Sequence, residues 1–143
     1  MVSSGIKVSQ QAIDAYNEMQ TKSTFKYIII GFDENYTKVE LKSVGNKDQS
    51  FDDFLQVLPE DKACYAFYDC AYKTKSGQQR NKILRVLWSS DEKCPGKEKM
   101  LISSTENEVR QKCPKYARGC SINCRSDLTE DNFINIVSDN RTY

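Results

Sequence analysis

Cysteine is the residue type in this sequence whose side chain offers the most chemistry. The chain has 143 residues, and its six cysteines are Cys64, Cys70, Cys94, Cys113, Cys120 and Cys124. A cysteine thiolate can act as a nucleophile, form a disulfide or bind a metal ion. The chain contains no histidine, which excludes Ser-His and Cys-His nucleophilic pairs and removes the commonest general base. A thiol-based redox protein, or an enzyme with one activated cysteine, remains open as an interpretation.

The spacing of the cysteines argues against a zinc site or a disulfide framework. The sequence has no C-x-x-C pair, the unit from which structural zinc sites are usually built, often together with histidine. Disulfide frameworks are typical of secreted chains, and the polar residues 1–11 do not have the pattern of a signal peptide. The longest apolar run, residues 27–32, is far too short to cross a bilayer. We therefore expect reduced thiols, no metal or other cofactor, no transmembrane segment and a cytoplasmic location.

Opposite charges nearly cancel along the chain. There are 21 lysines and arginines against 20 aspartates and glutamates, a formal net charge of +1. Non-specific binding to nucleic acid relies on a large positive field, so a nucleic-acid partner is not expected and any electrostatic binding site must be a local patch. The composition, 38% hydrophobic and 29% charged, is that of one polar-surfaced globular domain.

Hydrophobic periodicity predicts a helix followed by a buried strand pair in the first third of the chain. Ser9 can cap a helix that ends near Lys22 and whose apolar residues recur at helical spacing. Residues 25–32 contain four consecutive apolar residues, 27–30, and predict a central strand covered on both faces. Alternating residues over 37–44 predict its hairpin partner. Ser50 then opens a short helix with a capping box.

The rest of the chain continues the alternation of strand pairs and helices. Residues 64–68 and 83–88 are predicted strands joined by a polar, basic connection over residues 73–82. A long helix is expected from Pro95 until Pro114 forbids continuation. Residues 115–124 are ambiguous and leave one uncertain strand, and Asp127 or Thr129 can cap a last helix.

This order of elements predicts an α/β fold in which a mixed central β-sheet is sandwiched between helices. The sequence has no internal repeat or linker, so residues 1–143 are expected to form a single domain. Residues 1–8 are expected to be a flexible N-terminal tail, and residues 139–143 a C-terminal tail.

Four stretches of sequence, in order along nearly the whole chain, resemble the ADF/cofilin family. Residues 1–8 are similar to its short Ser-Gly-Val/Ile opening, and residues 65–72 (Tyr-Ala-Phe-Tyr-Asp-Cys-Ala-Tyr) to its Tyr-Ala-Leu-Tyr-Asp-Phe-Glu-Tyr strand. The strongest match is Trp-Ser-Ser-Asp at residues 88–91, followed by Lys-Glu-Lys-Met-Leu-Ile-Ser-Ser at residues 97–104. It resembles the family's Trp-x-Pro-Asp and Lys-x-Lys-Met-Leu-Tyr-x-Ser-Ser signature. Residues 126–130 resemble the Thr-Asp-Leu-Ser-Glu start of its last helix.

The resemblance implies the ADF/cofilin fold and a single ADF-homology domain that binds actin without catalysing a reaction. Its first actin-binding surface, used for monomers and filaments, combines the N-terminal tail with the long helix. In this sequence it maps to Ser3, Ser4, Gly5, Ile6, Lys97, Lys99, Met100 and Arg110. Without the resemblance, an ordinary solvated helix face is the better explanation of Lys97 and Lys99. Positions two apart on a regular helix also diverge by about 200°, so these two lysines cannot share one flat face.

The second surface implied by the resemblance contacts a neighbouring subunit of the filament. It lies on the connection between the two core strands and on the last helix, and it maps to Arg80, Lys82 and Arg141. Lys73 and Lys75 add charge on the other arm of the connection, where solubility is an equally good explanation. Arg141 is the only basic residue from residue 127 onward, so filament binding has less support than monomer binding.

The resemblance also implies a mechanism and its regulation. The protein is expected to be a monomer that prefers ADP-actin and promotes filament severing and depolymerisation in the cytoskeleton. Ser3 or Ser4 resembles the family's phosphorylated serine, and a phosphate adds about −1.5 to −2 charges to the tail. Acidic phosphoinositides are a further expected ligand of the basic patches. Two alternatives stay open: a monomer-sequestering ADF-homology protein with little filament binding, and the thiol-based redox protein.

Overall fold

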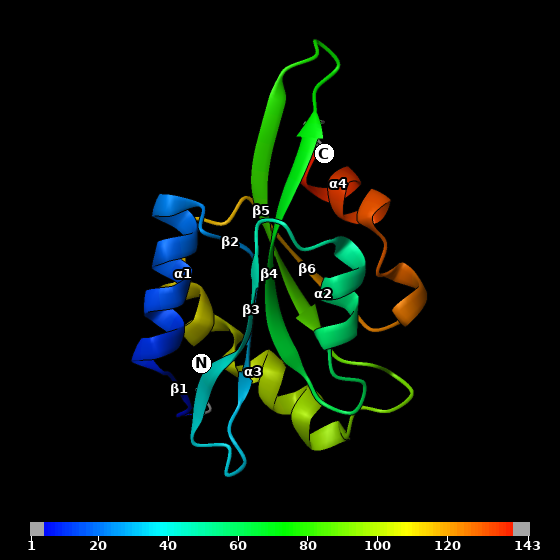
Figure 1. The fold of residues 1–143 in the computed structure, drawn as a ribbon. Helices are drawn as coiled ribbons and strands as arrows, with labels where there is room; N and C mark the ends of the chain where they lie inside the picture. The colour runs from blue at the N-terminus through cyan, green and yellow to red at the C-terminus, as the bar shows by residue number, and fades with distance from the viewer. Residues whose placement is uncertain (1–4, 139–143) are drawn as a thin grey trace.

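A mixed sheet of six strands forms the middle layer of the molecule in the computed structural model, which describes residues 5–138 (Figure 1). The strand order is β1-β3-β2-β4-β5-β6. The four central strands are antiparallel to one another, while the outer strands β1 and β6 pair in parallel with β3 and β5. In chain order the elements are β1 (Lys7–Val8), α1 (Gln10–Lys22), β2 (Phe25–Phe32), β3 (Lys38–Asn46), α2 (Phe51–Val57), β4 (Cys64–Lys73), β5 (Gln79–Trp88), α3 (Gly96–Lys112), β6 (Arg118–Ile122), a short 3-10 helix (Arg125–Asp127) and α4 (Glu130–Ser138).

Helices cover both faces of this sheet, as the sequence predicted. The helices α1 and α3 pack on one face and α2 and α4 on the other, and Figure 1 shows the two pairs on opposite sides. Along β2, Ile28 and Ile30 belong to the first core, whereas Tyr27 and Ile29 belong to the second. Because successive side chains of a strand point to opposite faces, the consecutive apolar run is buried on both sides. The prediction of a central strand over residues 25–32 is confirmed.

The helix starts that were predicted from capping residues are also confirmed. The Ser9 side chain accepts a hydrogen bond from the backbone N–H of Ala12 at 3.2 Å, at the start of α1. Ser50 and Asp53 form a reciprocal capping box at the start of α2. At the last helix, Thr129 is the capping residue because its hydroxyl accepts from the backbone N–H of Asn132 at 3.1 Å. The aromatic side chains expected in the core are buried: Tyr65, Phe67, Tyr68 and Trp88.

The expectation of a flexible tail over residues 1–8 is wrong for residues 6–8. Lys7 and Val8 form β1, and the pairing continues through a hydrogen bond from Ser9 N–H to Val39 C=O at 2.8 Å. Ile6 and Val8 are buried in the core shared by α1 and α3. The physical reason is the alternation of two apolar residues around one lysine, which lets a short strand bury one face.

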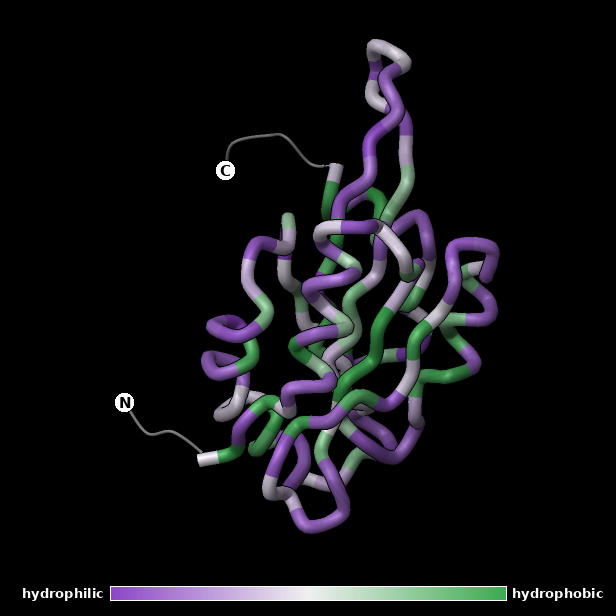
Figure 2. The backbone as a smooth tube through the Cα atoms, turned by 60° about the vertical axis from the view of Figure 1, so that its left-hand side comes forward, coloured by the Kyte–Doolittle hydropathy of each residue, from purple (hydrophilic) through white to green (hydrophobic). Residues whose placement is uncertain are grey.

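The connection between the two core strands is shorter than predicted. The strands β4 and β5 continue as a two-stranded ribbon, and only five residues, 74–78, connect them. Backbone pairing does not require apolar side chains. Residues 73 and 79–82, which were predicted to belong to the connection, are therefore part of the strands, and the pairs run from Cys70–Lys82 to Lys73–Gln79. Gly77, at φ 87°, supplies the left-handed conformation in the turn. This hairpin projects beyond the rest of the molecule (Figure 1), and it is mostly hydrophilic toward its tip (Figure 2).

The ambiguous segment after α3 contains a real strand. Residues 118–122 form β6, and its parallel register with β5 runs from Leu84–Arg118 to Trp88–Ile122. The helix α3 begins at Gly96, with Pro95 as its capping residue rather than in its first turn. Within residues 5–138, none of the helices has the length and apolar character needed to cross a bilayer.

Two candidate protein-binding surfaces

The N-terminal segment lies against α3, so the structure brings together two parts of the first predicted surface. Lys7 Nζ is 3.8 Å from Glu108 Oε1 on α3. On the buried side, Ile6 and Val8 share a core with Ile102 and Val109 of the same helix. We call Gly5, Lys97, Lys99, Met100 and Arg110 the helix surface; all of these are exposed except Lys99, which is half-buried. Ile6 itself is only 5% exposed, so the structure gives it the role of an anchor beneath this surface and not that of an exposed contact.

Met100 is the most prominent apolar side chain of the helix surface. It is 72% exposed, the highest value for any large apolar side chain in the described part of the chain. The opposite side of α3 packs on the sheet through Ile102 and Val109. Methionine is flexible and polarizable, and it is common at surfaces that adapt to a partner. An exposed methionine flanked by basic residues is therefore well suited to enter an apolar cleft with an acidic rim.

The basic residues of the helix surface point in different directions. Lys97 Nζ lies 4.5 Å from the centre of the Tyr36 ring. Lys99 Nζ instead lies 2.6 Å from Asp91 Oδ1, in the loop before α3. The geometric expectation that these two lysines do not share one flat face is confirmed. Arg110 is also paired, with its Nη2 at 3.1 Å from Glu106 Oε2.

Arg85 is a residue of this region that the sequence analysis missed. It lies on β5, is buried, and pairs with Glu106 of α3, while its guanidinium lies 5.4 Å from the centre of the Tyr116 ring. Burial alone would raise the pKa of Glu106, but hydrogen bonds from Arg85 and Arg110 more than offset this effect and hold that pKa below its usual value. Glu106 is thus an anion that connects the buried Arg85 to the exposed Arg110. The sequence did contain a signal for this buried ion pair, namely a charged residue inside the otherwise apolar run 83–88.

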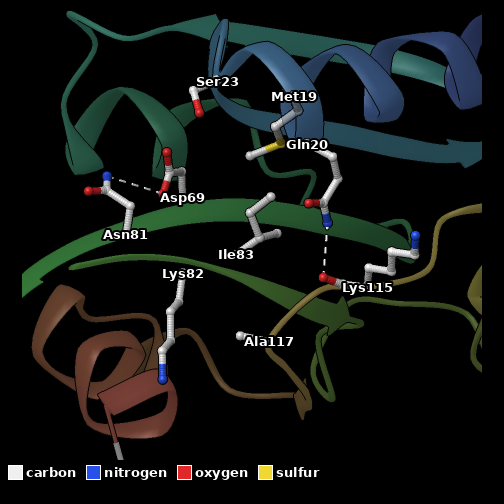
Figure 3. A pocket seen from close by; sticks show the side chains of 9 residues that line it. All are labelled: Met19, Gln20, Ser23, Asp69, Asn81, Lys82, Ile83, Lys115 and Ala117. Atoms are coloured by element: carbon white, nitrogen blue, oxygen red, sulfur yellow. Dashed lines mark hydrogen bonds between the residues drawn. The ribbon is translucent and has the colours of Figure 1, made fainter.

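In the structure, the two parts of the second predicted surface, the hairpin and the last helix, lie next to each other. Arg80 and Lys82 lie on β5 and not in a loop, because the strand already begins at Gln79. Lys82 Nζ donates to Val137 C=O at 3.4 Å, near the C-terminal end of α4, where a positive charge is stabilised by the helix dipole. In Figure 3, Lys82 extends toward α4, while Asn81 lies on the other side of the strand beside Asp69.

A groove of about 600 Å³ runs along this second surface. We call its basic residues, Lys73, Lys75, Arg80 and Lys82, the hairpin surface; the groove is completed by Tyr72, Thr74, Ser76 and Ser138. Arg80 Nη2 donates to Gln78 Oε1 at 3.0 Å. Lys73 and Lys75 thus line the same groove as the predicted pair. Three predicted site residues, Ser3, Ser4 and Arg141, lie outside the described residues.

The thiols offer little for a redox or nucleophilic function. Cys64, Cys70, Cys94 and Cys113 are buried, Cys120 is half-buried and Cys124 is exposed. Burial raises the pKa of Cys70 and of Cys113 to about 12 and that of Cys120 to about 11. Since reactivity follows the thiolate fraction, these groups are poor nucleophiles near neutral pH. Within residues 5–138, no group of three His, Cys, Asp or Glu side chains is placed to hold a metal ion.

The burial of these cysteines predicts how fast each thiol is modified by a reagent. At pH 7.5 an aromatic disulfide reagent should modify Cys124 rapidly and the other five cysteines at least tenfold more slowly, and all six should react after denaturation. The variant C124S should lose the rapid phase. A rapid phase that survives in C124S would reveal an activated thiol elsewhere and would support the redox alternative.

Comparisons with known proteins agree with the fold of this chain. The family model described as Cofilin/tropomyosin-type actin-binding protein matches residues 5–138. An actophorin from Entamoeba histolytica is 36% identical over 107 residues, covering 75% of this chain and 76% of that protein. A cofilin from Mycosarcoma maydis is 34% identical over 110 residues, covering 77% and 78%. Among solved structures, cofilin from Streptomyces griseoflavus aligns with a TM-score of 0.82 at 25% identity, covering 92% of this chain and 96% of that one. Actin depolymerization factor 2 from Plasmodium berghei aligns with a TM-score of 0.83 at 24% identity, covering 96% and 99%.

Proposed function

The chain belongs to the ADF/cofilin family of actin-binding proteins, and from this membership we propose that it binds actin monomers and filaments and promotes filament turnover. In this proposal it prefers ADP-actin, severs and depolymerises filaments, and catalyses no reaction. It acts as a monomer in the cytoplasm, at the actin cytoskeleton.

The observation that carries the proposal is the position of the N-terminal segment, which is anchored to the buried side of α3 and lies next to its exposed side. Ile6 and Val8 hold the segment against the helix, which leaves Lys97 and Met100 facing outward. An apolar side chain beside a basic one is complementary to an apolar cleft on an acidic protein such as actin. The helix surface is accordingly the proposed contact for both monomers and filaments.

The hairpin surface is the proposed contact with a second subunit of the filament. It lies on a hairpin that projects from the body of the protein (Figure 1) and it carries four basic residues. A protein that touches two neighbouring subunits can bind one filament twist more tightly than another. That difference in binding free energy shifts the filament toward the favoured twist, from which severing and subunit loss follow.

Two regulatory inputs belong to the proposal. Phosphorylation of Ser3 or Ser4 would add negative charge to the N-terminal tail and would oppose binding to an acidic partner. Acidic phosphoinositides would compete with actin for the same basic side chains through charge attraction.

Sedimentation of pre-formed actin filaments with the purified protein tests the proposed function. Loss of pelletable actin, with part of the protein in the pellet, is the expected result. Loss of pelletable actin with none of the protein in the pellet would favour the monomer-sequestering alternative. If the amount of pelletable actin does not change and the protein binds neither filaments nor monomers, actin binding by this chain is refuted.

The double variant R80A/K82A is expected to bind filaments about fivefold more weakly, because it removes two basic contacts at the rim of an interface. Its affinity for monomers should change less than about twofold. The measurement is co-sedimentation over a range of actin concentrations, with monomer binding followed in parallel. The matched control K22A/K62A removes the same charge from two exposed positions outside both surfaces, and it should bind filaments as the unmodified chain does. Unchanged co-sedimentation of R80A/K82A would show that the filament contact lies elsewhere.

A further inference from the structure

Tyr36 has a backbone conformation that is unusual for a bulky residue. It lies in the turn between β2 and β3 at φ 57°, in the left-handed region that favours glycine and asparagine. The neighbouring turn is held firmly, since Asp33 Oδ1 accepts from the backbone N–H of Thr37 at 2.7 Å and of Lys38 at 3.1 Å. Such conformations persist only where the surroundings determine them, and they gather at functional sites. The position of the Tyr36 side chain therefore needs an explanation.

The phenol of Tyr36 is fastened to the start of α3. Its hydroxyl donates to Glu98 Oε2 at 2.9 Å, and the other oxygen of this carboxylate accepts from the backbone N–H of Ala63 at 2.8 Å. Glu98 is only 6% exposed; its hydrogen bond to Ala63 is buried, and its hydrogen bond to Tyr36 is partly buried. The hydrogen bond to Glu98, followed by burial, raises the pKa of Tyr36 above its usual value, which keeps the phenol a donor. The turn and the first helical turn of α3 lie at the same end of the molecule (Figure 1).

The ring of Tyr36 also supports Lys97. The ammonium of Lys97 lies 4.5 Å from the ring centre, within the range of a cation–π interaction. Among the three basic side chains of the helix surface, Lys99 and Arg110 are paired with carboxylates. In the described part of the chain, no carboxylate forms an ion pair with Lys97. Its full charge is thus available to a partner, and the ring restricts the directions in which the long side chain points.

From this geometry we propose that Tyr36 is a positioning residue of the helix surface, which holds the start of α3 and orders Lys97 for contact with actin. The inference rests on the proposed function. An ordered lysine loses less side-chain freedom on binding than a mobile one, so pre-positioning increases affinity without an additional contact. The strained turn is the structural cost of placing an aromatic ring beneath this lysine.

Two substitutions separate the roles of the ring and the hydroxyl. Y36F keeps the ring and removes the hydrogen bond to Glu98. Y36N removes the ring and places in the turn a residue that accepts the left-handed conformation, which favours folding. We expect Y36N to weaken actin-monomer binding about two- to fivefold, and Y36F to stay within about twofold of the unmodified chain. If Y36F loses as much affinity as Y36N, the hydrogen bond to Glu98 and not the ring carries the effect, and the ordering of Lys97 by the ring is overturned.

A double-variant cycle with K97A shows whether Tyr36 affects actin binding through Lys97. If Tyr36 acts through Lys97, Y36N should have little effect in a K97A background. An equal loss in both backgrounds would overturn the inference while leaving the helix surface in place. If K97A alone binds actin as well as the unmodified chain, the helix surface is wrong and the inference fails with it.

Proton NMR of the protein without actin tests the contact itself. The ε-methylene protons of Lys97 should be shifted upfield by the ring current in the unmodified chain and in Y36F, and should return to ordinary values in Y36N. Absence of this shift in the unmodified chain would overturn the positioning role independently of any actin measurement. Chemical denaturation of each variant shows whether a loss of affinity reflects loss of folding.

Discussion

Replacement of Lys97 and Met100 by alanine is expected to weaken binding to actin monomers roughly thirtyfold, equivalent to about 2 kcal/mol. Met100 is the most exposed large apolar side chain in the described part of the chain, and Lys97 has no carboxylate partner there. In the proposed complex, the substitution of Met100 removes a buried apolar contact. The substitution of Lys97 removes a charge contact near the centre of the interface. The measurement is the dissociation constant for ADP-actin monomers, obtained with a fluorescent actin derivative.

The fold should survive this double substitution. Both side chains face solvent, and alanine has the highest intrinsic helix propensity, so α3 is not weakened. The matched control is K22A/V44A, which removes one exposed lysine and one exposed valine at the end of α1 and on β3. The control should bind monomers as the unmodified chain does. Unchanged binding by K97A/M100A, or an equal loss in the control, would refute the helix surface as the contact.

The elements that could be predicted from the sequence are those set by local chemistry. Ser9 and Ser50 cap helices because their hydroxyls reach backbone N–H groups within three residues, a distance that does not depend on the rest of the fold. The consecutive apolar residues 27–30 indicated a strand buried on both faces, since a sheet between two helical layers conceals consecutive side chains. The layered α/β fold follows from the order of these elements.

The features that escaped prediction depend on partners far away in the sequence. The strand β1 is two residues long and exists only because β3 offers an edge to pair with. The outer hairpin is polar, so its strands carry no hydrophobic signal and are defined by backbone pairing alone. The contact between Tyr36 and Lys97 joins residues that are 61 positions apart (97 minus 36). No local pattern reports such a contact, whereas the resemblance to a family indicated the two surfaces in outline.

The second large effect is expected from Arg85→Met, which should lower the free energy of unfolding by about 2–3 kcal/mol at pH 7. Arg85 is buried on β5 and neutralises Glu106 of α3, so it fastens the binding helix to the sheet. Methionine preserves the apolar stem but leaves the carboxylate without its buried partner. Removal of one partner from a fully buried pair costs about 3–5 kcal/mol, and the cost here is smaller because Glu106 is 27% exposed and keeps Arg110.

The pH dependence of this difference follows from the lowered pKa of Glu106. A carboxylate whose pKa is lower in the folded state adds stability above its unfolded pKa, near 4.5, and loses it as the pH falls through the folded value. Urea denaturation of both proteins should therefore show the full difference above about pH 5 and a smaller one below pH 4. A difference that is constant from pH 3 to pH 7 would mean that lost packing, and not the lost charge pair, destabilises the variant.

Gly119 provides the matched control for this interpretation. A Cβ atom at Gly119 would lie 2.8 Å from Arg85 Nη2, and the guanidinium cannot easily retreat because it is held by Glu106 and packed against Tyr116. We therefore expect G119A to destabilise the unmodified chain by about 1–2 kcal/mol, and to cost much less in the R85M background, where the guanidinium is gone. Equal costs of G119A in the two backgrounds would show that Arg85 does not occupy the space beside β6. The buried arginine thus explains two features that the sequence leaves unconnected: a charged residue in an apolar strand and a glycine in the edge strand beside it.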